Sequence, residues 1–457
     1  MAIELTFEHG TLVTAQLPQD ESVRQLFVAD PRTGVFRAPA QCYREIIVAL
    51  KRSAEDFVDR ARAFDRLALK LAIDVAPRPY QREALTRWAE AQGRGIAVLP
   101  TGAGKTLLAI MAMEHAKRPA LVVVPTIDLL HQWRATLERH FGIEIGVIGG
   151  GDNTLRPVTV TTYDSAALRA EFLGNRFGLL VCDECHHLPA PAYRFIAAGS
   201  IAPYRLGLTA TLERQDGGEA IAVELLGPVC HTAPIDALEG EYLAPYEVRT
   251  LRVSLSPEEQ AKHDAARAKY QAFKSKLGIS PSDPNGWTTF IMKAHQSAEG
   301  REAFAAWREQ RRIALGNDAK ITALFGVLKE HNQDRIIVFT HENELVYRLS
   351  RSFMLPAITH HTKPSERKRL LEDFATGALP VLLTAKVLNE GVDVPEANVG
   401  IVLAGSGSVR EHVQRLGRIL RKRPDKRAYL YEIVSEDSAE SMISDRRRQH
   451  RAYSRAD

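Results

Sequence analysis

The sequence contains no long apolar run. No stretch approaches the roughly 18 consecutive apolar residues that a membrane-spanning helix needs. The first residues carry Glu4 and Glu8 and no basic segment followed by an apolar run, so they do not resemble a secretory signal peptide. We therefore expect a cytoplasmic protein.

Cysteine is also scarce. Cys42, Cys182, Cys185 and Cys230 are too few and too scattered for a disulfide scaffold. Cys182 and Cys185 form a C-x-x-C pair, a spacing found in zinc and redox sites, but no second pair lies at zinc-site spacing. We therefore expect no metal–thiolate site and assign both residues to the acidic motif described below.

The composition is that of a folded protein with an uneven charge distribution. Of the 457 residues 45% are hydrophobic and 25% charged, and this length favours roughly two to four domains. The net charge is +4, yet residues 408–457 hold thirteen Lys and Arg against eight Asp and Glu, so this segment alone carries +5. A concentrated basic region favours a polyanionic partner, although a solvated tail has the same composition.

Two series of short apolar runs predict buried parallel strands. The first series lies at 96–99, 121–124, 158–160, 179–182 and 206–208, and the second at 336–339, 381–383, 399–403 and 429–431. Because these runs alternate with helical stretches, each series is typical of a doubly wound parallel sheet. The predicted fold class is α/β, with two doubly wound parallel-sheet lobes in tandem.

Two further segments depart from this pattern. Residues 1–75 combine strand patterns, joined by a turn at His9 and Gly10, with helical stretches at about 43–50 and 54–69, which predicts a small α+β domain. Between the two series, Ser256-Pro257-Glu258-Glu259 is a helix start. Helical sequence on both sides of a break at 280–286 predicts an inserted hairpin of two helices.

The segment 99–106 predicts a phosphate-binding loop. It reads Leu-Pro-Thr-Gly-Ala-Gly-Lys-Thr and lies between an apolar strand and a helix that begins near Thr106. Gly102 and Gly104 allow backbone N–H groups to surround phosphate oxygens, and the helix start adds a favourable dipole. Lys105 is expected to reach the β- and γ-phosphates and Thr106 to bind Mg²⁺, although Leu99 replaces the first glycine of the usual pattern. The expected ATP contacts in this loop are Thr101, Gly102, Ala103, Gly104, Lys105 and Thr106.

An acidic motif follows the run at 179–182. Asp183 and Glu184 stand where a parallel strand ends, which is the usual position of a metal-holding acid. Asp183 is expected to hold Mg²⁺, and Glu184 to orient or deprotonate the attacking water. An acidic pair alone would more often be a solvated surface feature; the phosphate-binding loop some 80 residues earlier favours the catalytic interpretation.

A third motif lies in the second lobe. In the segment 414–421 (Gln-Arg-Leu-Gly-Arg-Ile-Leu-Arg), Arg418 and Arg421 lie three residues apart, on one face of a helix. Their planar cations suit a γ-phosphate reached across a cleft, and an arginine finger of this kind stabilises the charge of the transferred phosphoryl group. The alternative is a basic surface helix. Gln414, Arg418 and Arg421 complete the predicted catalytic set.

The order of these motifs resembles superfamily 2 helicases, and specifically the XPB family of DNA-repair helicases in its compact archaeal and bacterial form. The resemblance covers essentially the whole chain and implies that both lobes are RecA-like. It also implies ATP- and Mg²⁺-dependent movement along DNA from 3′ to 5′. It implies adenine recognition by Arg78 and Gln81, and further nucleotide contacts from Gly391 and Asp393. It also implies strand binding or coupling to the nucleotide state by Thr126, Thr162, Thr209, Thr211, Thr340 and Thr384.

The resemblance extends to three features outside the motor. Residues 1–75 resemble the family's damage-recognition domain, and the insertion within 241–316 resembles its DNA-gripping thumb. The lobes would then span 76–240 and 317–457. After Thr211 the family has an Arg-Glu-Asp motif that helps to open the duplex; here Arg214, Gln215 and Asp216 occupy it, so strand separation by this element is in doubt.

Several alternatives stay open. The chain could be a duplex translocase with weak unwinding, an ATP-gated clamp that recruits a partner nuclease, or an RNA helicase, which the insertion and the N-terminal domain argue against. Trp133, Tyr163 and Trp287 could stack on bases, although isolated aromatic residues in such folds are more often core. We expect a monomer that acts on single-stranded and on forked or distorted duplex DNA and is associated with the nucleoid.

Overall fold

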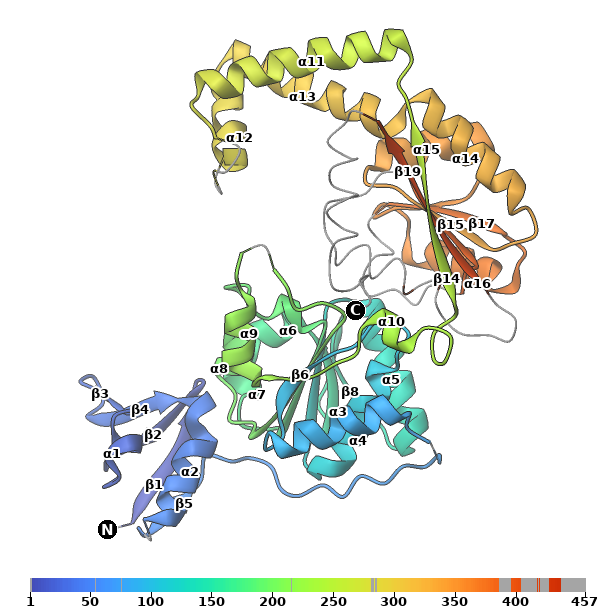
Figure 1. The fold of residues 1–457 in the computed structure, drawn as a ribbon. Helices are drawn as coiled ribbons and strands as arrows, with labels where there is room; N and C mark the ends of the chain where they lie inside the picture. The colour runs from blue at the N-terminus through green and yellow to red at the C-terminus, as the bar shows by residue number, and fades with distance from the viewer. Residues whose placement is uncertain are drawn as a thin grey trace. The chain divides into compact units, whose positions relative to one another are not determined.

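The described residues of the computed structural model divide into two compact units, one extending to Leu238 and the other beginning at Glu239 (Figure 1). Among the described residues, none of the helices combines the length and the apolar character that crossing a bilayer requires. The structure describes residues 2–53, 55–74, 76–214, 216–280, 283, 286–385, 396–403, 417, 419 and 427–436.

The first unit begins with a small domain built on a five-stranded sheet of order β3-β4-β2-β1-β5. His9 and Gly10, both at positive φ, form the two-residue turn between β1 and β2, as predicted. The apolar sides of the sheet and of α2 enclose one core that contains Leu5, Leu12 and Ile46. The elements are β1 (Ile3–Glu8), β2 (Thr11–Thr14), α1 (Glu21–Arg24), β3 (Val28–Asp30), β4 (Val35–Pro39), α2 (Tyr43–Arg52) and β5 (Phe57–Asp59).

The predicted helix over 54–69 is wrong. Phe57–Asp59 is the strand β5, which pairs in parallel with β1, and residues 60–74 form neither helix nor strand. Phe64 and Leu69 are buried, so the apolar spacing that imitates a helix instead anchors an irregular connection. This connection is bonded to the next domain, since Asn175 exchanges hydrogen bonds with Ala61 and Ala63.

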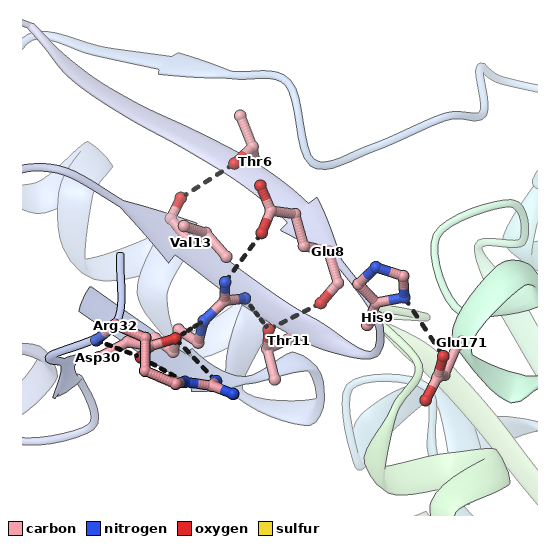
Figure 2. Close-up of polar contacts among 9 residues, drawn as sticks. Thr6, Glu8, His9, Thr11, Val13, Asp30, Arg32 and Glu171 are labelled. Atoms are coloured by element: carbon pink, nitrogen blue, oxygen red, sulfur yellow. Dashed lines mark hydrogen bonds and ion pairs between the residues drawn. The ribbon is translucent and has the colours of Figure 1, made fainter. Parts of the chain in front are cut away.

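The edge of this small domain carries a polar network (Figure 2). Arg32 and Arg37 both donate to Asp30, and Arg37 reaches Glu8 at 3.0 Å and Thr11 at 3.1 Å. These guanidinium groups, beginning with that of Arg32, hold the pKa of Asp30 well below its usual range. The network joins β4 to β3 and to the turn between β1 and β2.

The rest of the first unit is a doubly wound lobe, lobe 1, as predicted. Its eight-stranded sheet has the order β13-β6-β12-β11-β7-β10-β8-β9, and only β9 runs antiparallel to its neighbour. Alternate strand residues such as Leu121, Leu180 and Ile96 face a core shared with α6–α9, and α3–α5 pack on the opposite face (Figure 1). The strands are β6 (Arg94–Val98), β7 (Ala120–Val124), β8 (Gly146–Gly149), β9 (Asp152–Thr154), β10 (Val158–Thr162), β11 (Leu179–Asp183), β12 (Tyr204–Thr209) and β13 (Val229–Thr232). The helices are α3 (Pro79–Glu90), α4 (Lys105–Ala116), α5 (Ile127–Phe141), α6 (Tyr163–Leu168), α7 (Ala170–Leu173), α8 (Arg194–Ala198), α9 (Glu219–Leu226) and α10 (Ile235–Leu238).

The second unit contains the other doubly wound lobe, lobe 2, whose described strands are all parallel and follow the order β14-β19-β18-β15-β17-β16. Ile336, Val338 and Ile401 pack with residues of α14 and α15 in its core. The edge strand β14 lies before the range 317–457 that the sequence predicts for this lobe. The strands are β14 (Tyr246–Val253), β15 (Ile336–Phe339), β16 (Ala357–Ile358), β17 (Val381–Thr384), β18 (Val399–Val402) and β19 (Ala428–Ser435). The helices are α14 (Asp318–Glu330), α15 (Asn343–Phe353) and α16 (Pro364–Thr376).

The insertion between β14 and α14 is helical, as predicted, but it has three helices rather than two. They are α11 (Pro257–Lys276), α12 (Gly286–Gln296) and α13 (Ala298–Gly316), and α11 runs beside α13 (Figure 1). Ser256 and Glu259 form the capping box that the sequence indicated at the start of α11. The single helix predicted after the break at 280–286 is divided into α12 and α13, because the Ser297 side chain accepts from the N–H of Gly300 and starts a new helix.

Candidate functional site

Three motifs meet at the carboxyl edge of the lobe 1 sheet. The segment 99–104 follows β6, Asp183 is the last residue of β11, and Thr209 is the last residue of β12, which lies between β6 and β11. In parallel sheets this edge is the usual place for a ligand. The strand order therefore brings the predicted phosphate loop and the predicted metal-holding acid together.

The loop before α4 has the backbone of a phosphate cradle. Gly102 and Gly104 lie at φ 86° and 78°, in the region that favours glycine. A Cβ on Gly104 would lie 2.5 Å from the side-chain nitrogen of Gln81, so the residue must also be small. Leu99 is fully buried and its N–H donates to the carbonyl of Thr209 at 2.9 Å, which continues the strand pairing. The apolar residue at this position therefore adds one hydrogen bond to the pairing of β6 with β12, just beyond the end of β6.

Gln81 braces this loop from α3. Its side-chain nitrogen donates to the carbonyls of Ala103 at 3.0 Å and Gly104 at 3.2 Å, and its side-chain oxygen accepts from the N–H of Arg78. The Tyr80 hydroxyl donates to the same Ala103 carbonyl at 2.7 Å. Here Gln81 supports the backbone of the phosphate loop, a role that the sequence did not suggest. Adenine recognition by Arg78 and Gln81 stays a prediction.

Lys105 and Glu184 form an ion pair at this edge. Lys105 Nζ lies 3.1 Å from Glu184 Oε1, and both side chains are 12% exposed. Glu184 adopts a left-handed backbone conformation, at φ 47°, directly after the strand. The two predicted catalytic residues are thus in contact, at the point where the loop 99–104 ends and α4 begins.

Asp183 is buried and its carboxylate is held at both oxygens. Trp133 Nε1 donates to Oδ2 at 2.8 Å, and the N–H of Glu184 donates to Oδ1 at 3.0 Å. Burial, and then the neighbouring Glu184, raise the pKa of Asp183, while Lys105 and the Trp133 bond oppose the rise. The positive charge of Lys105 thus favours the ionised form of Asp183, and burial favours the protonated form.

These residues fit ATP with Mg²⁺. Among the described residues no cluster of three or more His, Cys, Asp or Glu side chains is arranged to hold a metal by itself. Mg²⁺, however, is commonly held by one or two carboxylates together with nucleotide phosphates. Asp183 and the half-buried Thr106 could supply hard oxygen donors for this purpose, and Lys105 could supply a cation for the phosphates.

A polar chain leads from Glu184 to the end of β12. His186 Nδ1 lies 3.1 Å from Thr209 Oγ1, and Glu184 Oε2 lies 3.4 Å from the same ring nitrogen. Thr209 Oγ1 lies 2.7 Å from the carbonyl oxygen of Thr211, to which it donates. His186 is the central member of this chain and was missed from the sequence. Its place in Asp-Glu-Cys-His, with two Thr residues at the end of a nearby strand, was the available signal.

Arg214 and Asp216 extend the chain toward the surface. Arg214 donates to the His186 carbonyl and forms a two-bonded ion pair with Asp216. Asp216 also accepts from the N–H of Gly218 at 3.1 Å. The side-chain bond from Arg214 is the main cause that lowers the pKa of Asp216 well below its usual range. Gln215 lies outside the described residues.

Thr126 and Thr162 also stand at the carboxyl edge of lobe 1. Each caps a helix: Thr126 accepts from the N–H of Leu129 at 3.3 Å at the start of α5, and Thr162 accepts from the N–H of Ser165 at 3.2 Å at the start of α6. Trp133 is 1% and Tyr163 2% exposed, so both are core residues rather than surfaces on which bases stack.

The predicted lobe 2 residues are described only in part. Thr340 and Thr384 are fully buried at the ends of β15 and β17, and the Thr340 N–H donates to the Thr384 carbonyl at 2.9 Å. Their hydroxyls bond to the carbonyls of Glu342 and Ala385. Both side chains therefore shape the loops that follow these strands. Gly391, Asp393, Gln414, Arg418 and Arg421 lie outside the described residues.

Cys182 and Cys185 are buried beside the acidic motif, and none of the four cysteines forms a disulfide. Burial raises the pKa of the Cys182 thiol to about 12 and that of Cys185 well above its usual value. Neither thiol is a ready thiolate, the form that metals bind.

Three family models match the chain. Residues 5–61 match the Xeroderma pigmentosum group B helicase damage recognition domain, residues 74–214 the Type III restriction enzyme, res subunit, and residues 303–452 the ERCC3/RAD25/XPB C-terminal helicase. The helicase domain of Hef from Pyrococcus furiosus is a structural neighbour with a TM-score of 0.54 at 19% identity, covering 82% of this chain and 98% of that one. The fold and the site define a two-lobed helicase-type ATPase.

Curated relatives are also similar over most of the chain. The DNA 3′-5′ translocase XPB2 of Sulfurisphaera tokodaii is 43% identical over 81% of this chain and 84% of the relative. The DNA 3′-5′ helicase XPB of Mycobacterium tuberculosis is 32% identical over 80% of this chain and 61% of the relative, and that of Kineococcus radiotolerans 32% over 86% and 66%. The chain belongs to the XPB family of helicases.

Proposed function

We propose that this protein is an ATP-dependent DNA helicase or translocase that moves from 3′ to 5′ and acts in DNA repair. The observation that carries the proposal is the contact between Lys105 and Glu184 beside the buried Asp183, at the sheet edge that also bears Thr126 and Thr162. The names of the curated relatives in the same family supply the polarity and the substrate.

The chemistry starts from the ion pair. Phosphate oxygens bound by the loop 101–106 compete with Glu184 for the Lys105 ammonium, which frees the Glu184 carboxylate to orient and deprotonate water. Asp183 and Thr106 would hold Mg²⁺, and the ion would supply neutralisation of phosphate charge. The family resemblance assigns charge stabilisation to Arg418 and Arg421, with Gln414, and nucleotide contacts to Gly391 and Asp393; all five residues lie outside the described part of the chain.

Coupling to DNA runs through the polar chain from Glu184 to Thr211. Because His186 joins Glu184 to Thr209, a change at the γ-phosphate alters the turn that carries Thr211 and Arg214. Thr126, Thr162, Thr340 and Thr384 fix the loops that meet the strand, mainly through phosphate contacts that do not depend on sequence. The substrates are single-stranded DNA and forked or distorted duplex.

The outer parts have separate roles in this proposal. Residues 1–75 sense distorted duplex, and the insertion within 241–316 grips DNA as a thumb. Trp287 is 44% exposed, its ring centroid lies 4.6 Å from that of Trp307, and Arg311 stands over Trp307, an arrangement suited to contact with bases and phosphates. The protein acts as a monomer at the nucleoid in the cytoplasm, with a partner nuclease as a candidate associate.

A duplex translocase with weak unwinding is the second candidate. It is favoured by Gln215 in place of the family's central acid, because Arg214 and Asp216 neutralise each other and no acid stands between them. The relative in Sulfurisphaera tokodaii bears the name translocase. An ATP-gated clamp would need no hydrolytic machinery, whereas Lys105, Glu184 and Arg421 are all present in this chain.

The test is ATP hydrolysis without nucleic acid and with single-stranded DNA, forked duplex or RNA, alongside strand separation of 3′-tailed and 5′-tailed forks. We expect stimulation by DNA and separation of the 3′-tailed fork alone, with Lys105→Ala inactive. Stimulation by DNA without separation would favour the translocase, and stronger stimulation by RNA would overturn the substrate.

A further inference from the structure

The indole of Trp133 fixes the orientation of the acid at the active site. Its Nε1–H donates to Asp183 Oδ2 at 2.8 Å, while the N–H of Glu184 holds Oδ1 at 3.0 Å. With both oxygens engaged, the carboxylate plane cannot rotate, and the remaining lone pairs keep a set direction. Partners of this kind orient metal-holding carboxylates elsewhere in proteins.

The same helix reaches the face where the strand is proposed to bind. Thr126 caps the start of α5, and Trp133 lies seven residues further on, which is roughly 10 Å along the axis. Leu130 and Leu137 are fully buried on the same helix and tie it to the lobe 1 core. A helix anchored in this way is a rigid element, so a displacement at Thr126 would be transmitted to the indole.

We propose that Trp133 is a positioning residue for Asp183, and that α5 carries the signal of strand occupancy from Thr126 to the metal-holding carboxylate. This inference rests on the proposed function and adds a second route to the chain through His186. The His186 route acts on Glu184 and the water, whereas the α5 route acts on the metal. Binding of a strand therefore tightens the hold on the metal.

A second tryptophan of lobe 1 provides a matched control. Trp88 in α3 is also 1% exposed, and its Nε1–H also donates at 2.8 Å, but to the carbonyl of Arg205 near the opposite end of β12. Replacing either tryptophan by phenylalanine removes one buried N–H donor and a similar volume from the same lobe. Only the Trp133 change removes a bond to a predicted metal-holding acid.

The experiment compares Trp133→Phe with Trp88→Phe in the full chain. Mn²⁺ binding in the presence of ADP is measured by electron paramagnetic resonance, and thermal unfolding is recorded in parallel. We expect Trp133→Phe to weaken Mn²⁺ binding by about tenfold or more, the size typical of a lost partner to a metal ligand, and Trp88→Phe to leave it unchanged. Both variants should lose similar thermal stability.

A third variant and a DNA arm complete the test. Trp133→His restores a ring N–H in less volume, and we expect it to recover part of the Mn²⁺ affinity that Trp133→Phe loses. Single-stranded DNA should lower the Mg²⁺ concentration for half-maximal hydrolysis in the wild type and in Trp88→Phe, but not in Trp133→Phe.

Equal Mn²⁺ affinity in the Trp133→Phe and Trp88→Phe variants would overturn the positioning role. If Trp133→Phe does not fold, Trp133→Leu, which also lacks the N–H donor, takes its place: Mn²⁺ binding weaker than that of Trp88→Leu supports the role, and equal binding sinks it. A half-maximal Mg²⁺ concentration that DNA lowers equally in all variants would overturn the relay. Absence of any DNA stimulation in the wild type would instead count against the proposed function, because the Mn²⁺ comparison needs no DNA.

Discussion

Lobe 1 and lobe 2 each hold a lysine in the first turn of a helix, and the two lysines have opposite surroundings. Lys105 is partly exposed and paired with Glu184, at the edge where the phosphate loop lies. Lys320 is fully buried, and its ammonium donates to the carbonyl of Leu403, directly after β18, at 2.9 Å. We therefore propose that the same residue type serves chemistry in one lobe, whereas in the other it holds the residue that follows a strand. The role of each lysine follows from its hydrogen-bond partner and its exposure, and not from its position in the helix.

The largest expected effect is a fall in kcat when an arginine of lobe 2 is removed, because the comparison above assigns chemistry to lobe 1 alone. We expect Arg421→Ala to lower kcat by about 10³–10⁵-fold, because an arginine finger stabilises charge only in the transition state. Single-turnover hydrolysis with DNA measures the loss, and an unchanged unfolding profile shows that the fold is intact. Robust hydrolysis by the purified variant would confine the chemistry to lobe 1.

The catalytic side of the comparison rests on Glu184. Glu184→Gln keeps the shape of the side chain but removes the base, and we expect kcat to fall by about 10²–10⁴-fold. ATP binding should persist, since Lys105 and the loop remain. Fluorescent-nucleotide binding together with steady-state hydrolysis checks both statements, and hydrolysis near the wild-type rate would contradict the assigned role.

The structural side of the comparison rests on Lys320. Lys320→Met keeps the aliphatic stem but leaves the Leu403 carbonyl without this donor, which should lower the unfolding free energy of lobe 2 by about 1–3 kcal/mol. Hydrolysis per folded molecule should stay near the wild-type value at low temperature. Chemical denaturation and kcat are the measurements; a loss of kcat without a loss of stability would reverse the distinction between the two lysines.

Asp30, in the small N-terminal domain, extends the comparison to a carboxylate whose contribution to stability depends on pH. Asp183 has a raised pKa through burial, whereas Arg32 and Arg37 lower the pKa of Asp30. A lowered pKa gives stability that is present above the unfolded value of about 4 and lost as the pH falls below it. Hydrogen exchange of β3 and β4 should thus be faster in Asp30→Asn than in the wild type at pH 7, and the difference should shrink on acidification. A difference that grows in acid would refute the sign.

The smallest effect concerns Gln215. If the missing central acid limits duplex opening, Gln215→Glu should raise strand separation a few-fold at matched ATP hydrolysis. Fork unwinding normalised to ATP consumed is the measurement. An unchanged ratio would dismiss the link between this position and strand separation.

Elements with strong local signals could be predicted from the sequence. The apolar runs gave β6, β7, β11 and β15, and the phosphate loop and acidic pair meet at the predicted edge. Short strands such as β8, β13 and β16 were missed because a few residues of a paired edge carry no periodicity of their own. Phe57–Asp59 was mistaken for helix because its pairing with β1 depends on residues far away in sequence.

The sequence predicts candidate catalytic residues in lobe 1, but it does not predict the residues that support them. Lys105 belongs to the phosphate-binding loop and Asp183 and Glu184 to the acidic motif, and both motifs can be found from residue types and spacing alone. Trp133 and Gln81 act through contacts 50 and 22 residues away along the chain, to Asp183 and to Ala103, which only the folded lobe reveals. A buried tryptophan in an amphipathic helix is indistinguishable from core in sequence, because its N–H partner is set by tertiary packing.

The base of the helical insertion has a consequence for how such a chain can be rebuilt. Glu259, in the first turn of α11, closes the capping box and also accepts from the N–H of Asp318, the first residue of α14, at 3.2 Å. The points where the chain leaves and re-enters lobe 2 therefore adjoin. A short turn could join them without stretching the sheet, so the outer part of the insertion can be lengthened or exchanged while Leu315, near the end of α13, keeps its place in the lobe 2 core.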